Sequence, residues 1–508
     1  MMNNLEPKNV FKYFLDICKI PHGSGNLDGI VSYLISFAKD RNLEYIVDDT
    51  KNVIIKKNGS GESVNNRRGE LCESVILQAH IDMVCVKTAT STKDMSKEGL
   101  DVYTDGNYLR AKDTSLGGDD GIGVAIILAM LDDGDVKVPI EALFTADEET
   151  GMYGAIGVDG NIFKGKKLIN IDSEEEGELT VSCAGGSHLD SSIPITRMVD
   201  FREPSFVNYT LKVTGLLGGH SGMEIHKGRA NAIVEIAYIL KEMSDEGIDY
   251  NLLSIEGGKF ENVICPEAKC EICVNTEDED KFKTLISKLE TELKKEYILT
   301  DKDIKIELSN FAGVSTTSPQ NVGGEQFGGL FSTASPLDKE STKRVIDTLI
   351  AIPQGLLEVS QEFINLPWTS VNLGVIKTEE DKITLTSLAR SNEDLKKNRV
   401  IKKYKTIFKS VGGKCEVRGE YPAWQYKKDS KLKEDLLSTY RELYGRDMKV
   451  VATHGGLECG LLLDKMKGLE AVSIGPTMKG VHSADETLYI DTVGKVYDFL
   501  LKYLEKQA

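Results

Sequence analysis

The chain has no apolar run long enough to cross a membrane. A membrane helix needs roughly 18 apolar residues or more, and the best candidate, Ile122–Leu131, has ten residues and predicts a buried helix. The first residues, Met1–Pro7, lack a basic segment followed by an apolar one, so no secretory signal is expected. The sequence therefore predicts a cytoplasmic protein with no membrane partner.

Positive charge is also scarce. The 508 residues carry 62 lysines and arginines against 80 acidic residues, which gives a net charge of -18. This excess of acid argues against a general nucleic-acid binder and against an anionic membrane surface as a partner. It does not exclude enzymes, whose clefts can be locally positive, and the 28% of charged residues is ordinary for a soluble globular protein.

The nine cysteines are an odd number and cannot all pair within one chain. Reduced thiols in a cytosolic protein are the simplest interpretation. Histidine is rarer still, with seven residues, and several of them lie in turns flanked by glycine. Such histidines are candidates for metal binding.

A chain of this length exceeds what one core usually supports, so two or more domains are expected. Strands alternate with helices at both ends of the chain, which implies an α/β sheet core. The helices expected in this core are 10–18, 28–40, 121–131, 431–443 and 492–504. Its expected strands are 45–47, 53–56, 75–79, 140–145, 167–170, 448–452 and 471–474.

The pattern changes after Gly185-Gly186 and returns at Lys431. In between, the order of elements suggests two βαββαβ-like units, although any α+β region can be divided in this way. We therefore expect an inserted α+β lid domain, 187–423, within a discontinuous metal-binding domain, 1–186 and 424–508. The insert's expected strands are 206–214, 251–256, 269–274, 304–308, 369–373, 382–388 and 414–420. Its expected helices are 229–243, 278–297 and 393–411, with one more from Lys339.

Five segments place possible metal ligands directly after predicted strands or in turns. They are His80 with Asp82, Asp119-Asp120, Asp147-Glu148-Glu149, Asp172 and His482. A set of histidines and carboxylates without thiolate suits a catalytic zinc, cobalt or manganese site. With one bridging carboxylate it can hold two cations, and a further carboxylate must stay uncoordinated to accept a proton from water. The adjacent Glu148 and Glu149 could divide these two tasks.

Each segment taken alone has a simpler explanation. Asp119-Asp120 could cap the helix that follows, because carboxylates are favourable at a helix N-terminus. The three acids Asp147-Glu148-Glu149 could form a solvated turn, and His482 could lie in a surface loop. The residues by themselves leave these alternatives open.

Together the segments resemble the M20 family of metallopeptidases, over nearly the whole chain and in family order. The matching strings begin at His80-Ile81-Asp82, Gly117-Gly118-Asp119, Asp147-Glu148-Glu149, Asp172-Ser173-Glu174, Gly218-Gly219-His220, His454-Gly455-Gly456 and Ser473-Ile474-Gly475, and end in His482-Ser483. Asp172–Gly177 and Gly456–Gly460 most resemble the aminoacyl-histidine (Xaa-His) dipeptidase branch. The resemblance implies a mixed-sheet di-metal peptidase domain with an inserted lid.

The resemblance also implies a role for each matching residue. The implied metal ligands are His80, Asp119, Glu149, Asp172 and His482, with Asp119 as the bridging carboxylate. Glu148 would be the general base, and Asp82 would orient His80 through its other ring nitrogen. Asp120 falls where relatives often carry asparagine, which favours Asp119 as the bridge. Position 85 is cysteine where relatives usually have proline; its thiol is expected to pack, with adventitious metal contact as the alternative.

Four further residues are implied in substrate binding. His220 matches a lid histidine that stabilises the oxyanion in relatives. Asn262 and Arg390 resemble groups that hold the substrate's backbone and terminal carboxylate, for which an arginine fork is geometrically suited. His454, at the start of a glycine-rich loop, would line the pocket.

The implied activity is hydrolysis of dipeptides, of the Xaa-His type or broader, by a metal-bridging hydroxide with Glu148 as general base. It requires two divalent cations per subunit, zinc first, with cobalt or manganese as alternatives. A second reading is an M20 amidohydrolase acting on N-acyl amino acids or longer peptides, and a third is a catalytically silent metal-binding scaffold. The branch resemblance favours a homodimer, whereas the doubled lid unit would also suit a monomer.

Overall fold

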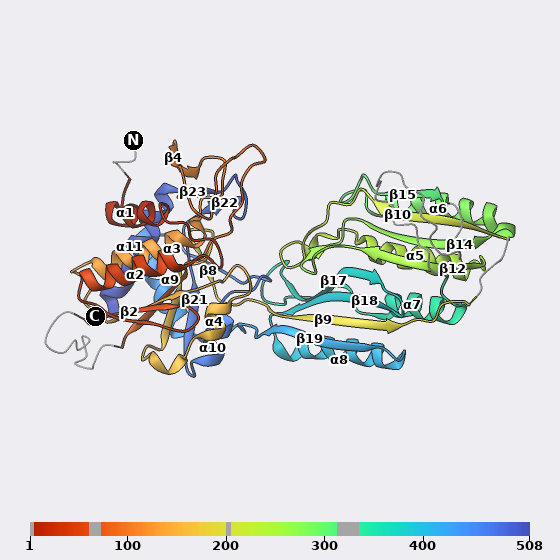
Figure 1. The fold of residues 1–508 in the computed structure, drawn as a ribbon. Coiled ribbons are helices and arrows are strands. Elements are labelled where there is room, and N and C mark those ends of the chain that lie inside the picture. The colour runs from red at the N-terminus through yellow and green to blue at the C-terminus, as the bar shows by residue number, and fades with distance from the viewer. Residues whose placement is uncertain (1–4, 60–72, 200–204, 312–334, 508) are drawn as a thin grey trace. The chain divides into compact units, whose positions relative to one another are not determined.

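The computed structural model describes residues 5–59, 73–199, 205–311 and 335–507 (Figure 1). The chain divides into two compact units. Unit 1 comprises Met1–Cys183 and Trp424–Ala508, and unit 2 comprises Ala184–Ala423. The chain thus leaves unit 1 once and returns to it once, with unit 2 as an insertion.

Unit 1 is built on a mixed eight-stranded sheet in the order β1-β2-β6-β3-β7-β21-β8-β20. Its central strand β3 runs parallel to both β6 and β7, and β7 runs parallel to β21. The strands β1 and β2 add an antiparallel edge. The strands are β1 (Glu44–Val47), β2 (Val53–Lys57), β3 (Val75–His80), β6 (Ile140–Thr145), β7 (Lys167–Asn170), β8 (Glu178–Thr180), β20 (Lys449–Val451) and β21 (Glu470–Ser473). This mixed sheet confirms the predicted α/β class.

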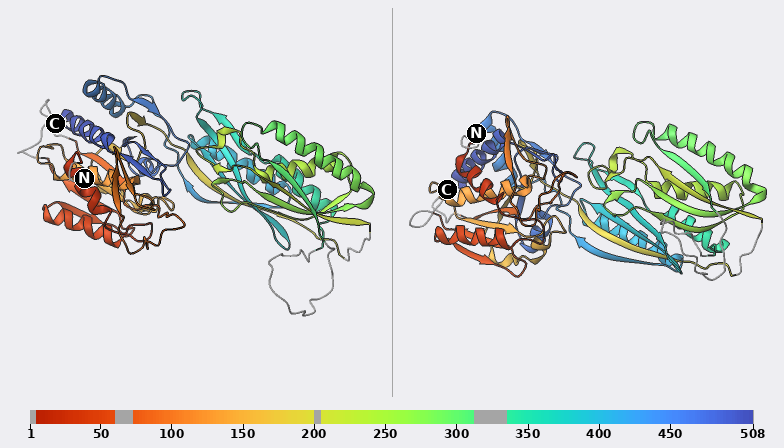
Figure 2. Two further views of the ribbon diagram at one scale, coloured as in Figure 1. Left: turned by 90° about the horizontal axis from the view of Figure 1, so that it is seen from above. Right: turned by 45° about the horizontal axis from the view of Figure 1, so that its top comes forward.

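Helices cover both faces of this sheet (Figure 2). Every residue of β3 and β6 is buried, as expected for parallel strands covered on both sides. The helices are α1 (Lys8–Ile17), α2 (Asp28–Asp40), α3 (Gly118–Asp132), α4 (Tyr153–Gly157), α9 (Lys431–Tyr444), α10 (Cys459–Lys465) and α11 (Ile490–Gln507). A small second sheet has the order β22-β23-β5-β4. Its strands are β4 (Val102–Asp105), β5 (Tyr108–Ala111), β22 (Met478–Lys479) and β23 (Thr487–Tyr489).

Unit 2 contains a nine-stranded antiparallel sheet in the order β15-β10-β14-β12-β17-β18-β9-β19, with β16 also paired to β17. Its strands are β9 (Gly185–Pro194), β10 (Phe206–Thr214), β12 (Tyr250–Gly257), β14 (Ala268–Asn275), β15 (Lys305–Asn310), β16 (Gly355–Val359), β17 (Pro367–Thr378), β18 (Lys382–Ser391) and β19 (Lys414–Tyr421). The helices α5 (Ala232–Asp245), α6 (Glu279–Glu296), α7 (Lys339–Ala351) and α8 (Asp394–Ser410) pack against it. A two-stranded ribbon, β11 (Gly219–His220) with β13 (Val263–Ile264), lies outside this sheet.

The sheet of unit 2 is a doubled βαββαβ arrangement. The first unit is β10-α5-β12-β14-α6-β15, and the second is β9-α7-β17-β18-α8-β19. In each, the strands lie in the order last, first, third, second, and the two second strands, β12 and β17, join the halves. The predicted second unit began at the helix from Lys339 and lacked its first strand. That strand is β9, which sequence analysis missed because its Gly-Gly start and its serines have low strand propensity.

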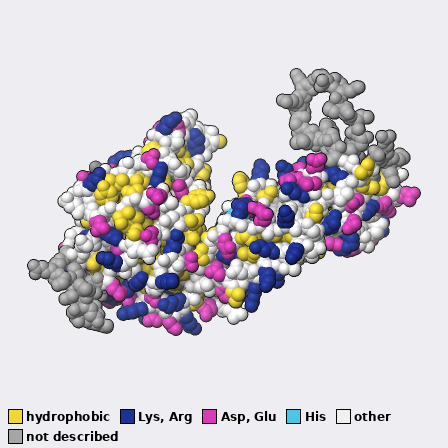
Figure 3. Space-filling model, turned by 60° about the horizontal axis from the view of Figure 1, so that its bottom comes forward, with side chains coloured by type: hydrophobic (Ala, Val, Ile, Leu, Met, Phe, Trp, Pro, Cys, Tyr) yellow, Lys and Arg dark blue, Asp and Glu magenta, His cyan; other side chains and the backbone are white. Residues whose placement is uncertain are grey.

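Charged side chains of both signs are mixed on the visible surface of each unit (Figure 3). None of the described helices is long and apolar enough to cross a membrane. All eight cysteines in the described ranges are reduced. Cys270 and Cys273 are separated by two residues on β14. Because side chains three positions apart on a strand point to opposite faces, these two thiols cannot bind one metal ion together.

Candidate active site

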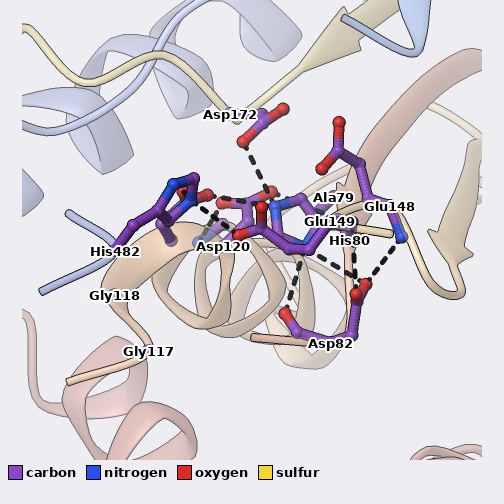
Figure 4. Close-up of polar contacts among 12 residues, drawn as sticks. Ala79, His80, Asp82, Gly117, Gly118, Asp120, Glu148, Glu149, Asp172 and His482 are labelled. Carbon is purple, nitrogen blue, oxygen red and sulfur yellow. Dashed lines mark hydrogen bonds and ion pairs between the residues drawn. The ribbon is translucent and has the colours of Figure 1, made fainter. Parts of the chain in front are cut away.

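The candidate site lies where three neighbouring parallel strands of unit 1 end. His80 is the last residue of β3, Asp172 follows β7 after one residue, and Glu148 and Glu149 follow β6. Because parallel strands place their carboxyl ends at one edge of a sheet, these side chains converge there. Figure 4 shows His80, Glu149, Asp172 and His482 turned toward one another.

Asp119 lies between the two histidines. Its Oδ1 is 3.0 Å from His80 Nε2, and its Oδ2 is 3.1 Å from His482 Nε2. The Nε2 of each histidine also meets one further carboxylate: Asp172 Oδ1 is 3.5 Å from His80 Nε2, and Glu149 Oε1 is 2.9 Å from His482 Nε2. Asp119 therefore joins two groups of ligand atoms, one around each histidine.

The neighbouring Asp120 is used differently. It is fully buried, and its carboxylate accepts hydrogen bonds from the backbone N–H groups of His80 (3.3 Å) and Gly123 (3.2 Å). Asp119 and Asp120 have non-helical backbone angles, so the regular part of α3 begins at Gly121, as predicted. Of the two residues, Asp120 therefore caps the N-terminus of the helix, as one of the alternatives for this segment proposed. Gly123 is required here because a Cβ would lie 2.3 Å from Asp120 Oδ1.

Asp82 holds both His80 and the loop after β6. Its Oδ1 lies 3.5 Å from His80 Nδ1 and accepts a hydrogen bond from the Glu148 N–H at 2.9 Å. Its Oδ2 accepts from the Glu149 N–H at 3.3 Å and from the Ser24 hydroxyl at 2.7 Å. One buried carboxylate therefore fixes the orientation of a histidine and the backbone of two acidic residues.

Glu486, for which the sequence suggested no role, anchors the glycine loop before Asp119. Its carboxyl oxygens accept hydrogen bonds from the N–H groups of Leu116 (2.7 Å), Gly117 (3.1 Å) and Gly118 (2.7 Å). Gly117 has a left-handed φ of 65°, and a Cβ there would lie 2.8 Å from Met83 Sδ. The hydrogen bonds to Glu486 and the close approach of Met83 to Gly117 fix the position of the loop that carries Asp119.

Glu458 is a second acid whose position the sequence did not reveal. It is fully buried, and its Oε2 accepts hydrogen bonds from Gln78 Nε2 and from the Thr145 hydroxyl, both at 2.6 Å. Gln78 in turn accepts from Asn170 Nδ2 at 2.7 Å. This network links the ends of β3, β6 and β7 beneath the site, and burial raises the pKa of Glu458 to about 7.

The site holds more acid than its bases balance. Burial and the repulsion of nearby acids raise the pKa of Asp172 to about 6 and that of Glu148 well above its usual value. Hydrogen bonds to Asp119 and Glu149 raise the pKa of His482 to about 11. Among the described residues, no lysine or arginine forms an ion pair with these carboxylates. An added cation would relieve this repulsion.

The donor atoms also suit metal ions. Three groups of side chains could each hold one ion: His80 with Glu148 and Glu149, His80 with Asp120 and Asp172, and Asp119 with Glu149 and His482. All donors are imidazole nitrogens or carboxylate oxygens, a set that fits zinc, cobalt or manganese. Cys85 is a member of none of the three groups.

The remaining predicted residues fall into two places. His454 belongs to unit 1, where it is 2% exposed in the loop between β20 and α10. His220, Asn262 and Arg390 belong to unit 2. His220 pairs with Val263 across the β11–β13 ribbon, and the Ser221 N–H donates to the carbonyl of Asn262 at 2.8 Å. The ribbon therefore brings His220 and Asn262 together.

The imidazole of His220 has a defined tautomer. Its Nδ1 accepts a hydrogen bond from the Met223 N–H at 3.1 Å. Since a neutral imidazole carries one proton, that proton lies on Nε2, which can act as a donor.

Arg390 is a buried cation in unit 2. It is 7% exposed, its Nη1 donates to the Tyr421 hydroxyl at 2.9 Å, and its Nε has no hydrogen-bond partner. No carboxylate within the described ranges forms an ion pair with it. On the adjoining strand β17, Asn372 donates to the carbonyls of Glu261 and Val263, both at 2.8 Å. This contact ties the turn that carries Asn262 to the strand beside Arg390.

Comparison with known proteins agrees with this arrangement. Residues 211–301, which include most of the first βαββαβ unit, match the family model of a peptidase dimerisation domain, M20_dimer. The chain is 33% identical to the cytosol non-specific dipeptidase of Escherichia coli, over 99% of each chain. Its structure is similar to the crystal structure of aminoacylhistidine dipeptidase from Vibrio alginolyticus, with a TM-score of 0.85. The match covers 99% of this chain and 98% of that one, and the two sequences are 34% identical.

A more distant structure shares the fold alone. Aminopeptidase PepT from Bacillus cereus matches with 14% identity and a TM-score of 0.55 over the whole of both chains. The similarity to the Escherichia coli and Vibrio proteins extends over unit 1 and unit 2 alike. The chain therefore belongs to the M20 family of metallopeptidases.

Proposed function

We propose that the protein is a metal-dependent dipeptidase that hydrolyses the amide bond of free dipeptides in the cytosol. The observation that carries this proposal is the placement of Asp119 between His80 and His482, with Glu148 fixed beside them by Asp82. The names of the two full-length relatives, a cytosol non-specific dipeptidase and an aminoacylhistidine dipeptidase, support the same substrate class.

Two divalent cations, zinc first and cobalt or manganese as alternatives, would be held by two ligand groups that share Asp119. His80 and Asp172 would complete one group, and His482 and Glu149 the other. When bound, such cations activate a water molecule and polarise the scissile carbonyl. Asp82 keeps the His80 ring oriented so that Nε2 faces the shared carboxylate.

Glu148 would act as general base and then as general acid. Its side chain is partly buried, and the loss of solvent together with nearby acids raises its pKa well above the usual value. A carboxyl with a raised pKa can take the proton of an attacking water and keep it until the departing amine needs it. Its backbone N–H bond to Asp82 keeps it in place during both transfers.

His220, Asn262 and Arg390 would bind the substrate. The Nε2–H of His220 would donate a hydrogen bond to the oxygen of the scissile carbonyl as negative charge develops there. Arg390 is a buried cation that pairs with no carboxylate of the described ranges. It would pair with the terminal carboxylate, for which a guanidinium gives two parallel hydrogen bonds. Asn262 would hold the substrate backbone, and His454 would line the pocket.

We further propose that 1–186 with 424–508 act as the catalytic domain and 187–423 as its lid. The match of residues 211–301 to a dimerisation domain supports a homodimer, whereas the doubled unit gives a monomer an internal equivalent of a second copy. Light scattering on the purified protein would separate a species of about 56 kDa from one of twice that mass.

The activity is tested by removing all metal and adding back zinc, cobalt or manganese one at a time. Each sample is then assayed with Xaa-His and other dipeptides, a tripeptide and an N-acetyl amino acid. We expect metal-dependent cleavage of the dipeptides and little of the others. Preferential cleavage of the acyl amino acid would favour the amidohydrolase alternative, and stoichiometric metal without any turnover would favour the scaffold.

A further inference from the structure

The two-stranded ribbon of unit 2 positions two of the residues proposed to bind substrate. His220 ends its first strand, β11, and Asn262 directly precedes its second strand, β13. The ribbon is a sheet of its own, separate from the nine-stranded sheet. Its position against the large sheet therefore depends on contacts other than strand pairing, and the turn before β13 makes several of them.

The backbone of this turn is packed directly against β17. A Cβ on Gly258 would lie 1.7 Å from the carbonyl oxygen of Gly374, and a Cβ on Gly374 would lie 2.4 Å from the Cα of Glu261. Both glycines are thus required by the close approach of the two backbones. Together with the two hydrogen bonds that Asn372 donates to the turn, this packing holds the turn against one strand, β17.

The side chain of Glu261 adds contacts with two other strands. Its Oε1 accepts a hydrogen bond from Arg418 Nη2 on β19 at 3.0 Å, and it lies 2.9 Å from His188 Nδ1 on β9. In the order β17-β18-β9-β19, these strands lie two and three positions away from β17. The turn and the Glu261 carboxylate together therefore reach from β17 to the edge strand β19.

The partners of the turn belong to one row across the sheet. Asn372 is opposite Leu388 on β18, and Leu388 is opposite His188 on β9. His188 is in turn opposite Arg418 on β19. Side chains that are directly opposite each other on paired strands lie on the same face of the sheet. The row thus presents polar groups on one face, and the turn is held at both ends of it, by Asn372 and by Arg418.

The contact between Glu261 and Arg418 is an ion pair. Partial burial opposes ionisation of Glu261, but hydrogen bonds from its own backbone N–H and from Arg418 lower its pKa. Burial and the nearby Arg418 lower the pKa of His188, so its ring is neutral near pH 7. Arg418 is also held by Asp190, whose Oδ2 accepts from its Nε at 2.6 Å. Arg418 is thus a fixed cation, and Glu261 is the acid that connects it to the turn.

We propose that Glu261 is a positioning residue that sets the place of Asn262 by clamping its turn to Arg418. The inference rests on the proposed dipeptidase function, in which Asn262 holds the backbone of the substrate. Glu261 would contact no reacting atom and would act through the residue next to it. Because the Ser221 N–H donates to the Asn262 carbonyl, the same clamp extends to the ribbon.

The first test removes the charge of Glu261 and keeps its size. Glu261→Gln should raise KM for a dipeptide about tenfold and change kcat less than threefold, because a displaced Asn262 binds the substrate less well before the reaction. The metal content and the ratio of activity on free to amidated dipeptides should stay at the wild-type values. Glu267→Gln, which changes an exposed acid of the same segment, is the matched control and should keep the wild-type KM.

A double variant separates positioning from a general loss of structure. In an Asn262→Ala background, Glu261→Gln should change kcat/KM less than twofold, because the residue that it positions has already lost its side chain. An equal loss in both backgrounds, or a wild-type KM in a folded Glu261→Gln protein, would overturn the proposal.

Arg418→Met breaks the same clamp from the other side and serves if Glu261→Gln fails to fold. It should raise KM as well and show the same dependence on Asn262. A folded Arg418→Met protein with the wild-type KM, or with an equal loss in the Asn262→Ala background, would also overturn the proposal.

A further readout does not require turnover. Hydrogen–deuterium exchange with mass spectrometry reports on the Ser221 N–H, which is bonded to the Asn262 carbonyl. We expect the peptide that contains Ser221 to exchange at least threefold faster in Glu261→Gln than in the wild type, with helix α8 unchanged as the control. Equal exchange would contradict the clamp. Faster exchange in a protein that hydrolyses no dipeptide would instead refute the proposed function and leave the clamp intact.

Discussion

The two units bury charge in opposite senses. In unit 1, Asp119, Glu148, Glu149 and Asp172 gather around two histidines without a lysine or arginine partner in the described ranges. In unit 2, Arg390 is buried without a carboxylate partner in those ranges. Burying unpaired charge is costly, so each arrangement requires a reason beyond folding.

The difference fits the ligand proposed for each unit. As proposed above, metal ions would complete the cluster of acids in unit 1, and a substrate carboxylate would complete the guanidinium of Arg390. A free dipeptide offers both a carbonyl that metals can polarise and a terminal carboxylate that arginine can bind. The acidic cluster of unit 1 and the buried arginine of unit 2 are thus two independent observations that favour the same class of substrate.

The largest effect is expected from removing the proton acceptor of unit 1. Glu148→Gln keeps the size of the side chain and loses its basicity, so kcat should fall about 1,000-fold, within the range typical of general acid–base catalysis. Metal content should be unchanged. The matched control is Glu175→Gln, which changes a partly exposed acid paired with Lys479; this variant should keep its activity. Near-normal turnover of Glu148→Gln would remove the general-base assignment.

The next test removes the cation of unit 2. Arg390→Met should lower kcat/KM for dipeptides about 100-fold, because the substrate carboxylate loses its charged partner. Dipeptides amidated at the C-terminus should be poor substrates for both proteins and discriminate little between them. Because no carboxylate in the described ranges pairs with Arg390, its replacement should not lower the free energy of unfolding.

Arg418→Met is the control for this change, since Arg418 is half exposed and already paired with Asp190 and Glu261. It should leave the preference for a free carboxylate intact. If Arg390→Met cleaved free and amidated dipeptides with the wild-type ratio, Arg390 would have no part in carboxylate binding.

A smaller effect is expected from Glu486, which supports the acidic cluster without belonging to it. Glu486→Ala leaves the buried N–H groups of Leu116, Gly117 and Gly118 without their acceptor. Urea unfolding should show that the free energy of unfolding falls by about 2–4 kcal/mol, the range for several buried donors that lose a carboxyl partner. Metal affinity should fall as well, because the Asp119 loop loses its anchor. If the urea midpoint of Glu486→Ala equalled that of the wild type, Glu486 would not be the anchor of this loop.

The smallest effect concerns Glu235, an acid buried on α5 of unit 2. Burial raises its pKa from 4.5 to about 7, and Tyr297 donates a hydrogen bond to its Oε1 at 2.7 Å. A folded-state pKa above the unfolded value means that stability falls as pH rises from about 4.5 through 7. The full shift corresponds to at most about 3 kcal/mol. Glu235→Gln should remove this part of the pH dependence and be more stable than wild type at pH 8 but not at pH 5.

Much of the site could be predicted from the sequence because its residues lie at the ends of predicted strands. His80 ends a strand, and Asp172 and the acids after β6 follow strands, that are easy to recognise from their apolar residues. The regular part of α3 begins at Gly121, where its glycine turn indicated. Local chemistry therefore predicted which residues face the carboxyl edge of the sheet.

Other features depend on contacts between distant segments. Glu486 reaches the loop at Gly117 across 369 positions, and no local pattern marks that distance. Asp119 and Asp120 have the same side chain, and the resemblance favoured Asp119 as the bridge, but the hydrogen-bond partners that make Asp120 the cap come from the structure. Strand β9 was missed because its residues favour turns, while its pairing with β18 and β19 provides the ordering free energy.

The most direct test of the proposed metal site is the cation content of three proteins, measured by mass spectrometry of the metal after chelation and reloading with zinc. The wild type should hold two ions per chain, Asp120→Asn should also hold two, and Asp119→Ala should lose both or retain one weakly. Two tightly held ions in Asp119→Ala, or fewer than two in the wild type, would contradict a pair of cations joined by Asp119.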